Sequence, residues 1–385
     1  MKTFIKIFTG ITLFIGVLCL ILAASGNSHV ISGMTKTYFK GMIKPDIDDH
    51  IDHYLREVKA ADFPQPWTKL NSLKALTKDQ DEFCQSLGTV AYLVAVDGEI
   101  VCEQYWEGYD SSSISNSFSM GKTFAATCIG HAIDNGLIND IDDPVTKYLS
   151  GMSTGLNAQL TIRHLLQMSS GINFGEHYTN PFGYQAKAYY GSDLESATRK
   201  FVVTGTPGET WKYEGGNTVY LSLILREISG LTLSEYFSKY FWSQLGTENP
   251  AWWNIDRPGG LEKSFSAFYA TAPDYARFGQ LFLDSGEWRG KQLISKQFMS
   301  ESTSPVMIPD IAGEPVWQYG YHWWLGNWDG HDFYSARGME GQYIACIPHL
   351  NMVMVRLGHK RIPEYVNHAS LDLYQFLDIA KSVSE

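Results

Sequence analysis

The sequence predicts an α/β chain of the α+β type, in which an antiparallel sheet flanked by helices is built from both ends of the chain. Two observations predict this fold class. Strand-like segments occur near residue 90 and again in the last third, and amphipathic helices fill the stretch between them, at about 125–260. With 385 residues, 44% of them hydrophobic, the chain can bury the core of one large domain or of two closely packed ones.

The N-terminus has the order of an export segment. Lys2 and Lys6 come before an apolar run over 11–24, and small and polar residues follow it. The run is near the upper length of a signal peptide and slightly short for a comfortable membrane span. Apolar residues continue beyond Cys19, which argues against a lipid-modified cysteine at the mature end.

Two alternatives follow for residues 1–25. They are a signal peptide cleaved after about Ser25 or Gly26, or they are an uncleaved membrane anchor. The first predicts a periplasmic or secreted protein, and the second a membrane-anchored protein whose domain lies outside the cytoplasm. Residues 26–84, which prolines interrupt, are expected to form a lead-in that packs on the catalytic domain, itself expected at 85–380.

The sheet begins with a hairpin. Residues 88–109 hold two β-rich runs joined by Asp97-Gly98, a dipeptide typical of two-residue hairpin turns. The later strands are expected in 319–328, 341–348 and 352–358, where apolar and aromatic residues are concentrated.

Helical spacing of apolar residues predicts the middle and the end of the chain. The expected helices are 121–136, closed by Asn135-Gly136; 161–172, capped by Thr161; two in 217–246, separated at Ser229-Gly230; 272–286; and a terminal one in 368–383.

Composition and cysteine spacing restrict the partners. The chain has 41 acidic and 30 basic residues, and its net charge of −11 would repel a polyanion, so nucleic acid is not an expected partner. The cysteines after the export segment lie too far apart for a zinc site, and no metal or cofactor is expected: Cys84, Cys102, Cys128 and Cys346. Buried free thiols are expected, with a disulfide between Cys84 and Cys102 across the hairpin as the alternative.

The residue pair that predicts chemistry is Ser119 with Lys122. Residues three apart on a helix share a face, so the Lys122 amine can reach the Ser119 hydroxyl. The first turn of a helix also offers unpaired N–H groups to a developing negative charge. A lysine serves as a base only when it is neutral, which burial favours by lowering its pKa. Gly121, between the two, is expected to leave the helix surface open to a substrate.

Five blocks of the sequence carry a family resemblance: "SFSMGKT", "DIDDPVTKYL", "TIRHLLQMSSGI", "GTPGETWKYEGGNTVYLSLILREISG" and "APDYARFGQLFLDSGEWRGKQLIS". In this order they resemble the serine β-lactamase-related family, which includes class C β-lactamases, D-alanyl-D-alanine carboxypeptidases, esterases and 6-aminohexanoate-dimer hydrolases. The resemblance covers about residues 85–375 and implies a β-lactamase/transpeptidase-like fold.

The resemblance also implies roles. Ser119 would be the acylated nucleophile, Lys122 the residue that accepts its proton, and Tyr213 the tyrosine that helps to activate the serine and later water. A tyrosine hydroxyl near ammonium groups is expected to have a lowered pKa. Class C enzymes have Tyr-x-Asn at this motif, but the third residue here is Gly215, so Asn217 is the nearest candidate for the asparagine's contact with substrate.

The third family motif departs from Lys-Thr-Gly. Ala336-Arg337-Gly338 stands in its place and resembles the 6-aminohexanoate-dimer hydrolase and esterase branch. By this match the backbone N–H groups of Met339 and Ser119 would form the oxyanion hole, while Arg337 and Gly338 would contact substrate. The absence of the motif lysine predicts weak or no activity on β-lactams.

Two further groups of residues are candidates for the site. The loop "GINFGEHYTNPFGYQAKAYYG" resembles the segment that covers the acyl pocket, and Tyr178 is its candidate for a substrate-facing hydroxyl; an ordinary packed loop is the alternative. His164 and His322 suggest an alternative mechanism in which a histidine activates a serine. No Gly-x-Ser-x-Gly turn surrounds any serine, which removes the main support for that mechanism.

The sequence therefore predicts a serine hydrolase that cleaves an ester or amide of a small molecule through an acyl-enzyme on Ser119. A β-lactamase or D-alanyl-D-alanine carboxypeptidase is the enzymatic alternative. A membrane-tethered sensor or binding protein of the same fold is the non-enzymatic one. The oligomeric state is not determined by the sequence.

Overall fold

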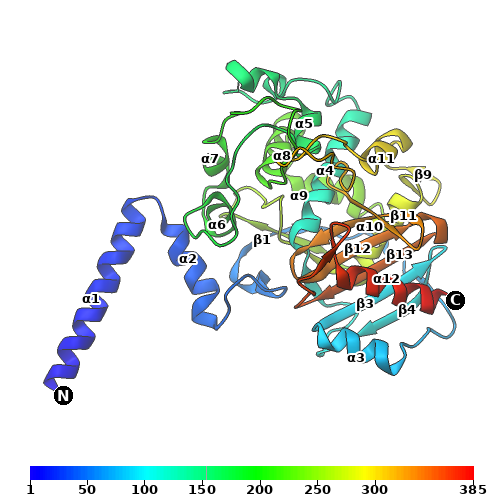
Figure 1. Cartoon of the computed structure of the whole chain (residues 1–385), viewed down its shortest axis with the longest axis horizontal. Helices are drawn as coiled ribbons and strands as arrows, with labels where there is room; N and C mark the ends of the chain where they lie inside the picture. Colours follow the sequence, from blue (N-terminus) through cyan, green and yellow to red (C-terminus); the bar gives the residue numbers. More distant parts are fainter. Residues whose placement is uncertain (153) are drawn as a thin grey trace.

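The computed structural model describes residues 1–152 and 154–385 and is organised around a large mixed sheet. Within these residues the sheet has the strand order β10-β11-β12-β13-β3-β4-β2 (Figure 1). Its strands are β2 (Thr68–Lys69), β3 (Thr89–Val96), β4 (Glu99–Tyr105), β10 (Trp324–Trp328), β11 (His331–Gly338), β12 (Gln342–Ile347) and β13 (Met352–Gly358).

The two ends of the chain meet in the middle of this sheet. Strand β13 pairs antiparallel with β3, so that Met354 lies opposite Val94. The hairpin between β3 and β4 turns at Asp97-Gly98, and both of these residues have the positive φ that its tight turn requires. The sheet built from both ends of the chain is thus as predicted, except that β2 joins its edge in parallel.

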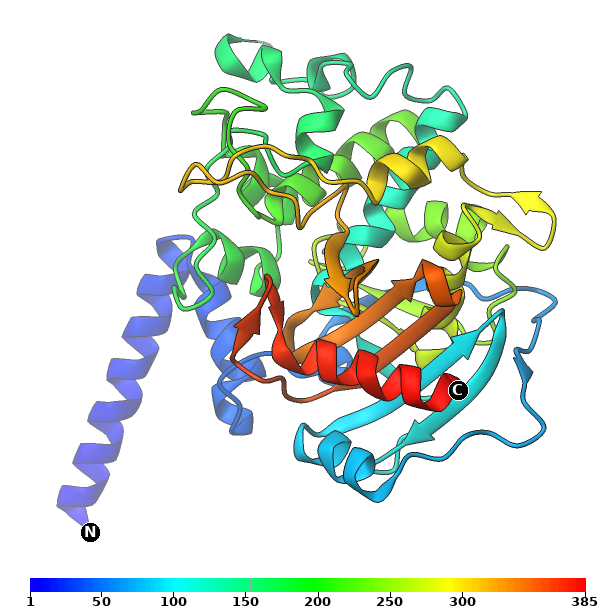
Figure 2. The ribbon, with the colours of Figure 1, turned by 45° about the vertical axis from the view of Figure 1, so that its right-hand side comes forward.

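Each face of the sheet packs on a helix. Alternate residues of β13 point to opposite faces: Val353 and Val355 belong to the larger core cluster beside α10 (Ala272–Leu283), and Met352 and Met354 to a second cluster beside α12 (Leu371–Ser384). Figure 2 shows α12 lying along one face of the sheet. The sheet is therefore buried on both sides, which explains why β13 is apolar at nearly every position.

The helical region lies on the α10 side of the sheet and is built around α4 (Gly121–Asp134), which α8 (Gly216–Ser229) and α9 (Leu233–Phe237) contact. Thr161 caps the short helix α5 with the predicted hydrogen bond to the His164 N–H. The remaining helices are α3 (Lys78–Ser86), α5 (Ile162–Leu166), α6 (Tyr184–Tyr190), α7 (Leu194–Arg199) and α11 (Lys296–Ser302).

A smaller sheet, absent from the sequence predictions, lies under the helical region. It pairs β1 (Tyr54–Val58), β6 (Ala251–Ile255), β7 (Phe268–Thr271) and β5 (Ile114–Asn116) in that order. Strand β11 and the two-residue hairpins β8–β9 (Glu287–Trp288, Lys291–Gln292) and β14–β15 (Tyr365–Val366, Ala369–Ser370) were not predicted either. These strands are short or follow sequence without clear alternation, so no local signal marks them.

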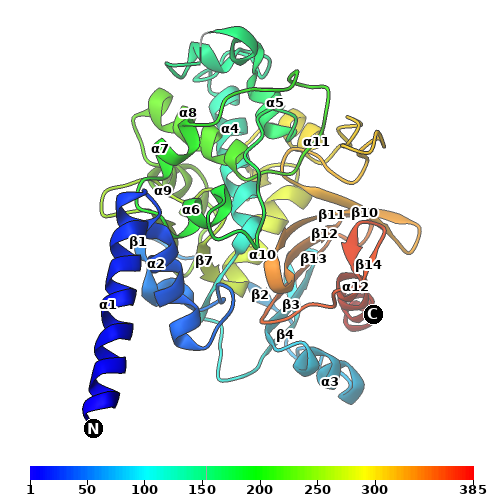
Figure 3. The same ribbon diagram turned by 60° about the vertical axis from the view of Figure 1, so that its left-hand side comes forward.

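The N-terminal helices stand at the side of the body. Helix α1 (Lys2–Ala24) meets α2 (Ser28–Lys36) at a short turn, and its free end points away from the rest of the chain (Figures 1 and 3). Within α1, Lys6–Ala24 is long and apolar enough to cross a membrane, with a mean hydropathy of 2.6, and none of it is buried. A signal sequence has the same properties, so this helix fits both alternatives for residues 1–25.

A polar cluster attaches the segment after α2 to the body. The buried carboxylate of Asp49 accepts hydrogen bonds from Tyr189, Tyr269 and Asn116. Burial acts to raise the pKa of Asp49, but the hydrogen bonds from His53 and the tyrosines outweigh it and hold the pKa below its ordinary value. A paired, ionised carboxylate therefore links residues far apart in the sequence.

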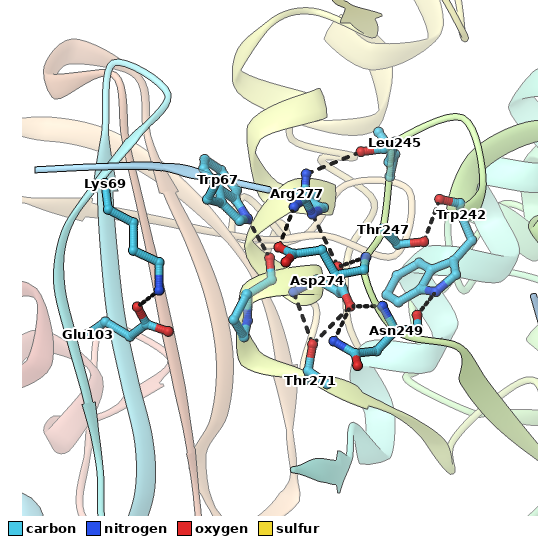
Figure 4. A network of polar contacts seen from close by, with 12 residues as sticks. Trp67, Lys69, Glu103, Trp242, Leu245, Thr247, Asn249, Thr271, Asp274 and Arg277 are labelled. Carbon is cyan, nitrogen blue, oxygen red and sulfur yellow. Dashed lines mark hydrogen bonds and ion pairs between the residues drawn. The ribbon is translucent and has the colours of Figure 1, made fainter. Parts of the chain in front are cut away.

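A second buried cluster fixes the start of α10. Figure 4 shows Asp274 with Thr271, Asn249 and Arg277 turned toward it. Asp274 accepts hydrogen bonds from the Thr271 hydroxyl at 3.0 Å, the Asn249 backbone N–H at 3.1 Å and Arg277 Nε at 3.1 Å. Arg277 also donates to Glu248 at 2.9 Å. The cluster joins α10, which packs on the large sheet, to the loop that precedes β6 of the smaller sheet.

We predict that Asp274→Ala lowers the free energy of unfolding by about 3–5 kcal/mol, because it removes the buried carboxylate that pairs with Arg277 and accepts the Asn249 N–H and the Thr271 hydroxyl, which leaves Glu248 as the only charged partner of Arg277 among the described residues. Urea-induced unfolding of the purified protein measures this. The control is Lys78→Ala, which removes an exposed ion pair with Glu82 and should change stability by less than about 0.5 kcal/mol. Equal effects of the two variants would contradict the importance given to the Asp274 cluster.

Candidate active site

Ser119 lies in a strained turn between β5 and α4. The turn is the short 3-10 helix η3 (Phe118–Met120), in which Phe118 has a φ of 44°, a left-handed conformation that non-glycine residues seldom adopt. The side-chain oxygen of Asn116 accepts the Phe118 N–H at 2.8 Å and so holds this conformation. The strain positions the half-buried Ser119 side chain two residues before Gly121, the first residue of α4.

Lys122 is buried and its amine faces Ser119. The Lys122 Nζ donates to Ser119 Oγ at 3.0 Å and to the Phe265 backbone carbonyl at 2.7 Å. Burial lowers the pKa of Lys122, while the charges of Tyr178 and Glu176 act to raise it. The predicted proximity is present, together with an environment that favours the neutral amine required of a base.

The expectation for Gly121 was wrong. A side chain there would meet the backbone of Ser266, whose carbonyl oxygen lies 3.2 Å from the position of a Cβ. Gly121 therefore does not expose the helix to a substrate. It allows the segment with Ser266 and Phe265 to approach α4 closely, and this approach brings the Phe265 carbonyl to Lys122. The sequence pattern identified a small residue, but not the neighbour that requires it.

Tyr213 lies against Lys122. The Lys122 Nζ is 4.9 Å from the centre of the Tyr213 ring, and the rings of Trp324 and Tyr319 pack around the tyrosine. Burial raises the pKa of Tyr213 above its ordinary value, although the Ser119 hydroxyl acts to lower it. The expected lowering of the tyrosine pKa is wrong for this structure, because desolvation dominates. Tyr213 is thus a neutral hydroxyl beside Ser119 at neutral pH.

The end of β11 packs against the Ser119 turn. A Cβ at Gly338 would lie 2.2 Å from the Ser117 carbonyl oxygen, so only glycine permits this contact. It places Met339, the next residue, beside the turn that carries Ser119. The backbone N–H groups of Ser119 and Met339 have no acceptor among the residues that the structure describes, which leaves both available to a substrate oxyanion. Gly338 itself is buried and acts through this close approach.

Arg337 makes its contacts with Ser335, His368 and Trp324. Its Nε donates to Ser335 Oγ at 2.8 Å, its Nη1 donates to the His368 carbonyl at 3.0 Å, and its guanidinium lies over the Trp324 ring. Trp324 in turn contacts Tyr213, with ring centres 5.3 Å apart. Burial lowers the pKa of Arg337 to about 10, so the group remains charged at neutral pH. The Trp324 indole ring thus contacts both Arg337 and Tyr213.

The other two candidates for substrate contact differ in exposure. Tyr178 is 62% exposed and lies at the open edge of the site; partial burial of its hydroxyl raises its pKa above the ordinary value, although the charge of Lys122 acts to lower it. Asn217 is buried and donates its amide to the Glu214 carbonyl at 3.1 Å and to Met168 Sδ at 3.4 Å. Asn217 therefore has no surface to offer a substrate and is not brought into the site.

The two histidines have structural contacts. His164 Nδ1 accepts the Thr161 backbone N–H at 3.1 Å at the start of α5. His322 is buried between the carbonyls of Lys122 and Leu165, and burial lowers its pKa to about 4. Neither ring forms a hydrogen bond with Ser119 among the described residues, so the Ser-His mechanism has no geometric support. Sequence reasoning missed the support that His322 gives to Lys122.

Glu176 is a further residue that the sequence did not reveal. It lies in the same loop as Tyr178, and its Oε1 accepts the Gly216 backbone N–H at 3.1 Å, at the start of α8. Burial raises the pKa of Glu176 to about 7; the Lys122 charge acts against this rise, and the Glu214 charge adds to it. A single glutamate in a loop of aromatic and small residues gave no pattern from which this position could have been predicted.

Metal-ligating side chains come together outside the site. Asp46, Asp48 and His359 lie within reach of one ion in the described part of the chain, but His359 pairs with Asp46 at 3.0 Å and Asp48 accepts a hydrogen bond from Tyr109. The polar atoms of these three side chains thus find partners in one another and in Tyr109, and the contacts join the N-terminal segment to the end of β13.

The free cysteines Cys84 and Cys102 are buried in one hydrophobic cluster.

Both the sequence and the fold are similar to those of known proteins. The sequence model of the Beta-lactamase family matches residues 73–373. The chain belongs to the Beta-lactamase family. Its fold is similar to that of a solved penicillin-binding protein from Bacillus halodurans, with a TM-score of 0.61 and 18% identity over 79% of this chain and 99% of that one. The β-lactamase/transpeptidase-like fold predicted from the sequence is confirmed.

Two other relatives are similar over most of their length. The 6-aminohexanoate-dimer hydrolase of Paenarthrobacter ureafaciens is 25% identical over 337 residues, which are 83% of this chain and 85% of that protein. A Bacillus anthracis protein assigned as a 6-aminohexanoate-dimer hydrolase has a TM-score of 0.74 and 23% identity over 87% of this chain and 92% of that one. The chain is a serine hydrolase of the β-lactamase-related family, active on amide or ester bonds.

We predict that Gly338→Ala lowers kcat about a hundredfold, because the added methyl group must displace the end of β11 from the Ser119 turn. Steady-state hydrolysis of an ester substrate measures the loss. The control is Gly205→Ala, since a Cβ there meets only ordinary contacts at 3.8 Å. Wild-type kcat in Gly338→Ala would show that Met339 does not depend on this contact.

Proposed function

We propose that Ser119 is the nucleophile of this hydrolase and that Lys122 is its base. The observation that supports this assignment is the Lys122 amine 3.0 Å from Ser119 Oγ, buried and held by the Phe265 carbonyl. In this arrangement the amine can accept the serine proton while the serine oxygen attacks the substrate carbonyl carbon. Ser119 and Met339 contribute their free backbone N–H groups to the oxyanion that forms.

Tyr213 has a neutral hydroxyl in this proposal. Because burial keeps its pKa above the ordinary value, Tyr213 acts as a hydrogen-bond donor and as a relay for the proton rather than as a phenolate base. In acylation the proton passes from Lys122 to the leaving group, with Tyr213 beside the path. In deacylation a water molecule takes the place of the leaving group, and Lys122 accepts its proton.

The substrate is proposed to be a linear amide or ester of a small carboxylic acid. The support is the similarity to 6-aminohexanoate-dimer hydrolases and the sequence Ala336-Arg337-Gly338 in place of Lys-Thr-Gly. Arg337 turns its guanidinium toward Trp324 and His368, so it does not replace the lysine that attracts a β-lactam carboxylate. Tyr178, at the open edge, is placed to contact the substrate. A β-lactamase or carboxypeptidase activity is therefore the less favoured alternative.

The site of action is proposed to be outside the cytoplasm. The apolar helix α1 precedes the catalytic domain and is exposed along the membrane-compatible stretch Lys6–Ala24, as a signal peptide or an anchor would be. A periplasmic or secreted enzyme follows if α1 is removed. An enzyme attached to the membrane surface follows if it is kept.

We predict that Ser119→Ala abolishes hydrolysis of a short-chain p-nitrophenyl ester and of a linear aminohexanoate amide, while its thermal melting temperature stays near that of the wild type. The loss follows from removal of the attacking oxygen. A chromogenic cephalosporin, tested in parallel, should be turned over slowly or not at all by the wild type.

The contrary outcomes separate the alternatives. Rapid cephalosporin turnover would favour a β-lactamase. If the wild type cleaves none of the three substrates and forms a stable adduct with an acylating probe, the sensor or binding-protein alternative is correct. Turnover that persists in Ser119→Ala would refute the assignment of the nucleophile.

A further inference from the structure

Gly215 occupies the third position of the motif that begins at Tyr213, where class C enzymes have asparagine. The structure shows why no side chain is present. A Cβ at Gly215 would lie 3.1 Å from Glu176 Oε1 and 2.8 Å from the Phe265 Cβ. The Glu176 carboxylate, which comes from the loop that carries Tyr178, thus fills the space beside this position. On the other side of Gly215 is Phe265, whose carbonyl holds the Lys122 amine.

Reciprocal hydrogen bonds fix the Glu176 carboxylate at this place. Glu176 Oε1 accepts the Gly216 backbone N–H at 3.1 Å, and Glu214 Oε1 accepts the Gly175 backbone N–H at 3.1 Å. Each glutamate therefore binds the backbone of the segment that carries the other. These two bonds tie the loop over the site to the residues that follow Tyr213.

We propose that Glu176 is a positioning residue for Lys122, and that its carboxylate stabilises the ammonium that Lys122 becomes when it accepts the Ser119 proton. The inference rests on the proposed function and adds a residue to it. In the acylation step the Ser119 O–H bond breaks, the proton binds the Lys122 lone pair, and the serine oxygen bonds to the carbonyl carbon. Glu176 keeps its charge throughout and forms no covalent bond.

The charges around Glu176 agree with this role. Lys122 from α4 acts to lower the pKa of Glu176, Glu214 acts to raise it, and burial brings it to about 7. In return, the Glu176 charge acts to raise the pKa of Lys122 and of Tyr213. Tyr178, from the same loop, is the other titratable group whose charge acts on Lys122. Above about pH 7 the carboxylate is ionised and favours proton transfer to Lys122.

The test is the pH dependence of ester hydrolysis in Glu176→Gln, an isosteric variant. In the wild type we expect kcat/KM to rise with pH around 7, as Glu176 ionises. In Glu176→Gln this rise should disappear between pH 6 and 8, and kcat should be about tenfold or more below that of the wild type with little change in KM. Glu176→Asp, which keeps the charge, should restore the rise in part.

Glu214→Gln is the matched control, because it removes the charge of the other glutamate in the reciprocal pair while its amide oxygen can still accept the Gly175 N–H. Since the Glu214 charge raises the pKa of Glu176, this variant should keep the rise and move it to lower pH. A wild-type profile in Glu176→Gln would overturn the inference. An equal loss of kcat in both Gln variants, with the rise of kcat/KM around pH 7 still present, would also overturn it. That result would indicate that the two glutamates only hold the loop in place.

The two proposals fail in different ways. If Ser119→Ala retains turnover, the proposed function is wrong whatever Glu176 does. If Ser119→Ala is inactive and Glu176→Gln behaves as the wild type, only the role of Glu176 is wrong. Circular dichroism shows whether Glu176→Gln folds. If it does not fold, the pH profile of Glu176→Asp decides, because the shorter side chain withdraws the carboxylate. This change should shift the rise of kcat/KM with pH and lower kcat.

Discussion

The burial of the Lys122 amine beside Ser119 is the constraint on which the rest of the site depends. An amine removed from water is costly to charge, so it is kept near neutrality only while its surroundings stay closed. The Phe265 carbonyl, the ring of Tyr213 and the His322 contact with the Lys122 carbonyl together form those surroundings. Close approach at Gly121 and at Gly215 makes them possible, because side chains at either position would force the segment around Phe265 away.

The second constraint is the position of the two N–H groups that would bind the oxyanion, and the N-terminal segment supports both. On one side, Asn116 donates its backbone N–H to Ile47 at 2.8 Å and its side chain to Asp49 at 3.0 Å, and the same Asn116 holds the strained Phe118 before Ser119. On the other side, Lys44 pairs with Glu340, the residue after Met339. Three residues of the lead-in, Lys44, Ile47 and Asp49, thus contact segments next to both halves of the candidate oxyanion hole.

The sequence predicted the features that depend on neighbours along the chain. The Asp97-Gly98 turn, the Thr161 cap and the shared face of Ser119 and Lys122 all follow from spacings of a few residues. The smaller sheet did not, because it pairs Tyr54 with Ile255, about two hundred positions apart, through strands too short to alternate clearly. The raised pKa of Tyr213 and the burial of Asn217 could not be predicted from the sequence either, because both depend on the residues that the fold brings around them.

The contacts of the lead-in also bear on how it connects the apolar helix α1 to the body. A flexible spacer between α1 and the body would need no buried charge. Here the spacer carries Asp49, whose ionised carboxylate is held by Tyr189, Tyr269 and Asn116, with buried Lys263 nearby at a pKa lowered by burial to about 7. Such a network is stable only when complete, because an unpaired buried charge is strongly destabilising. We therefore expect the lead-in to be an integral part of the folded domain and the Ser119 turn to depend on the contacts of residues 44–49 with Asn116.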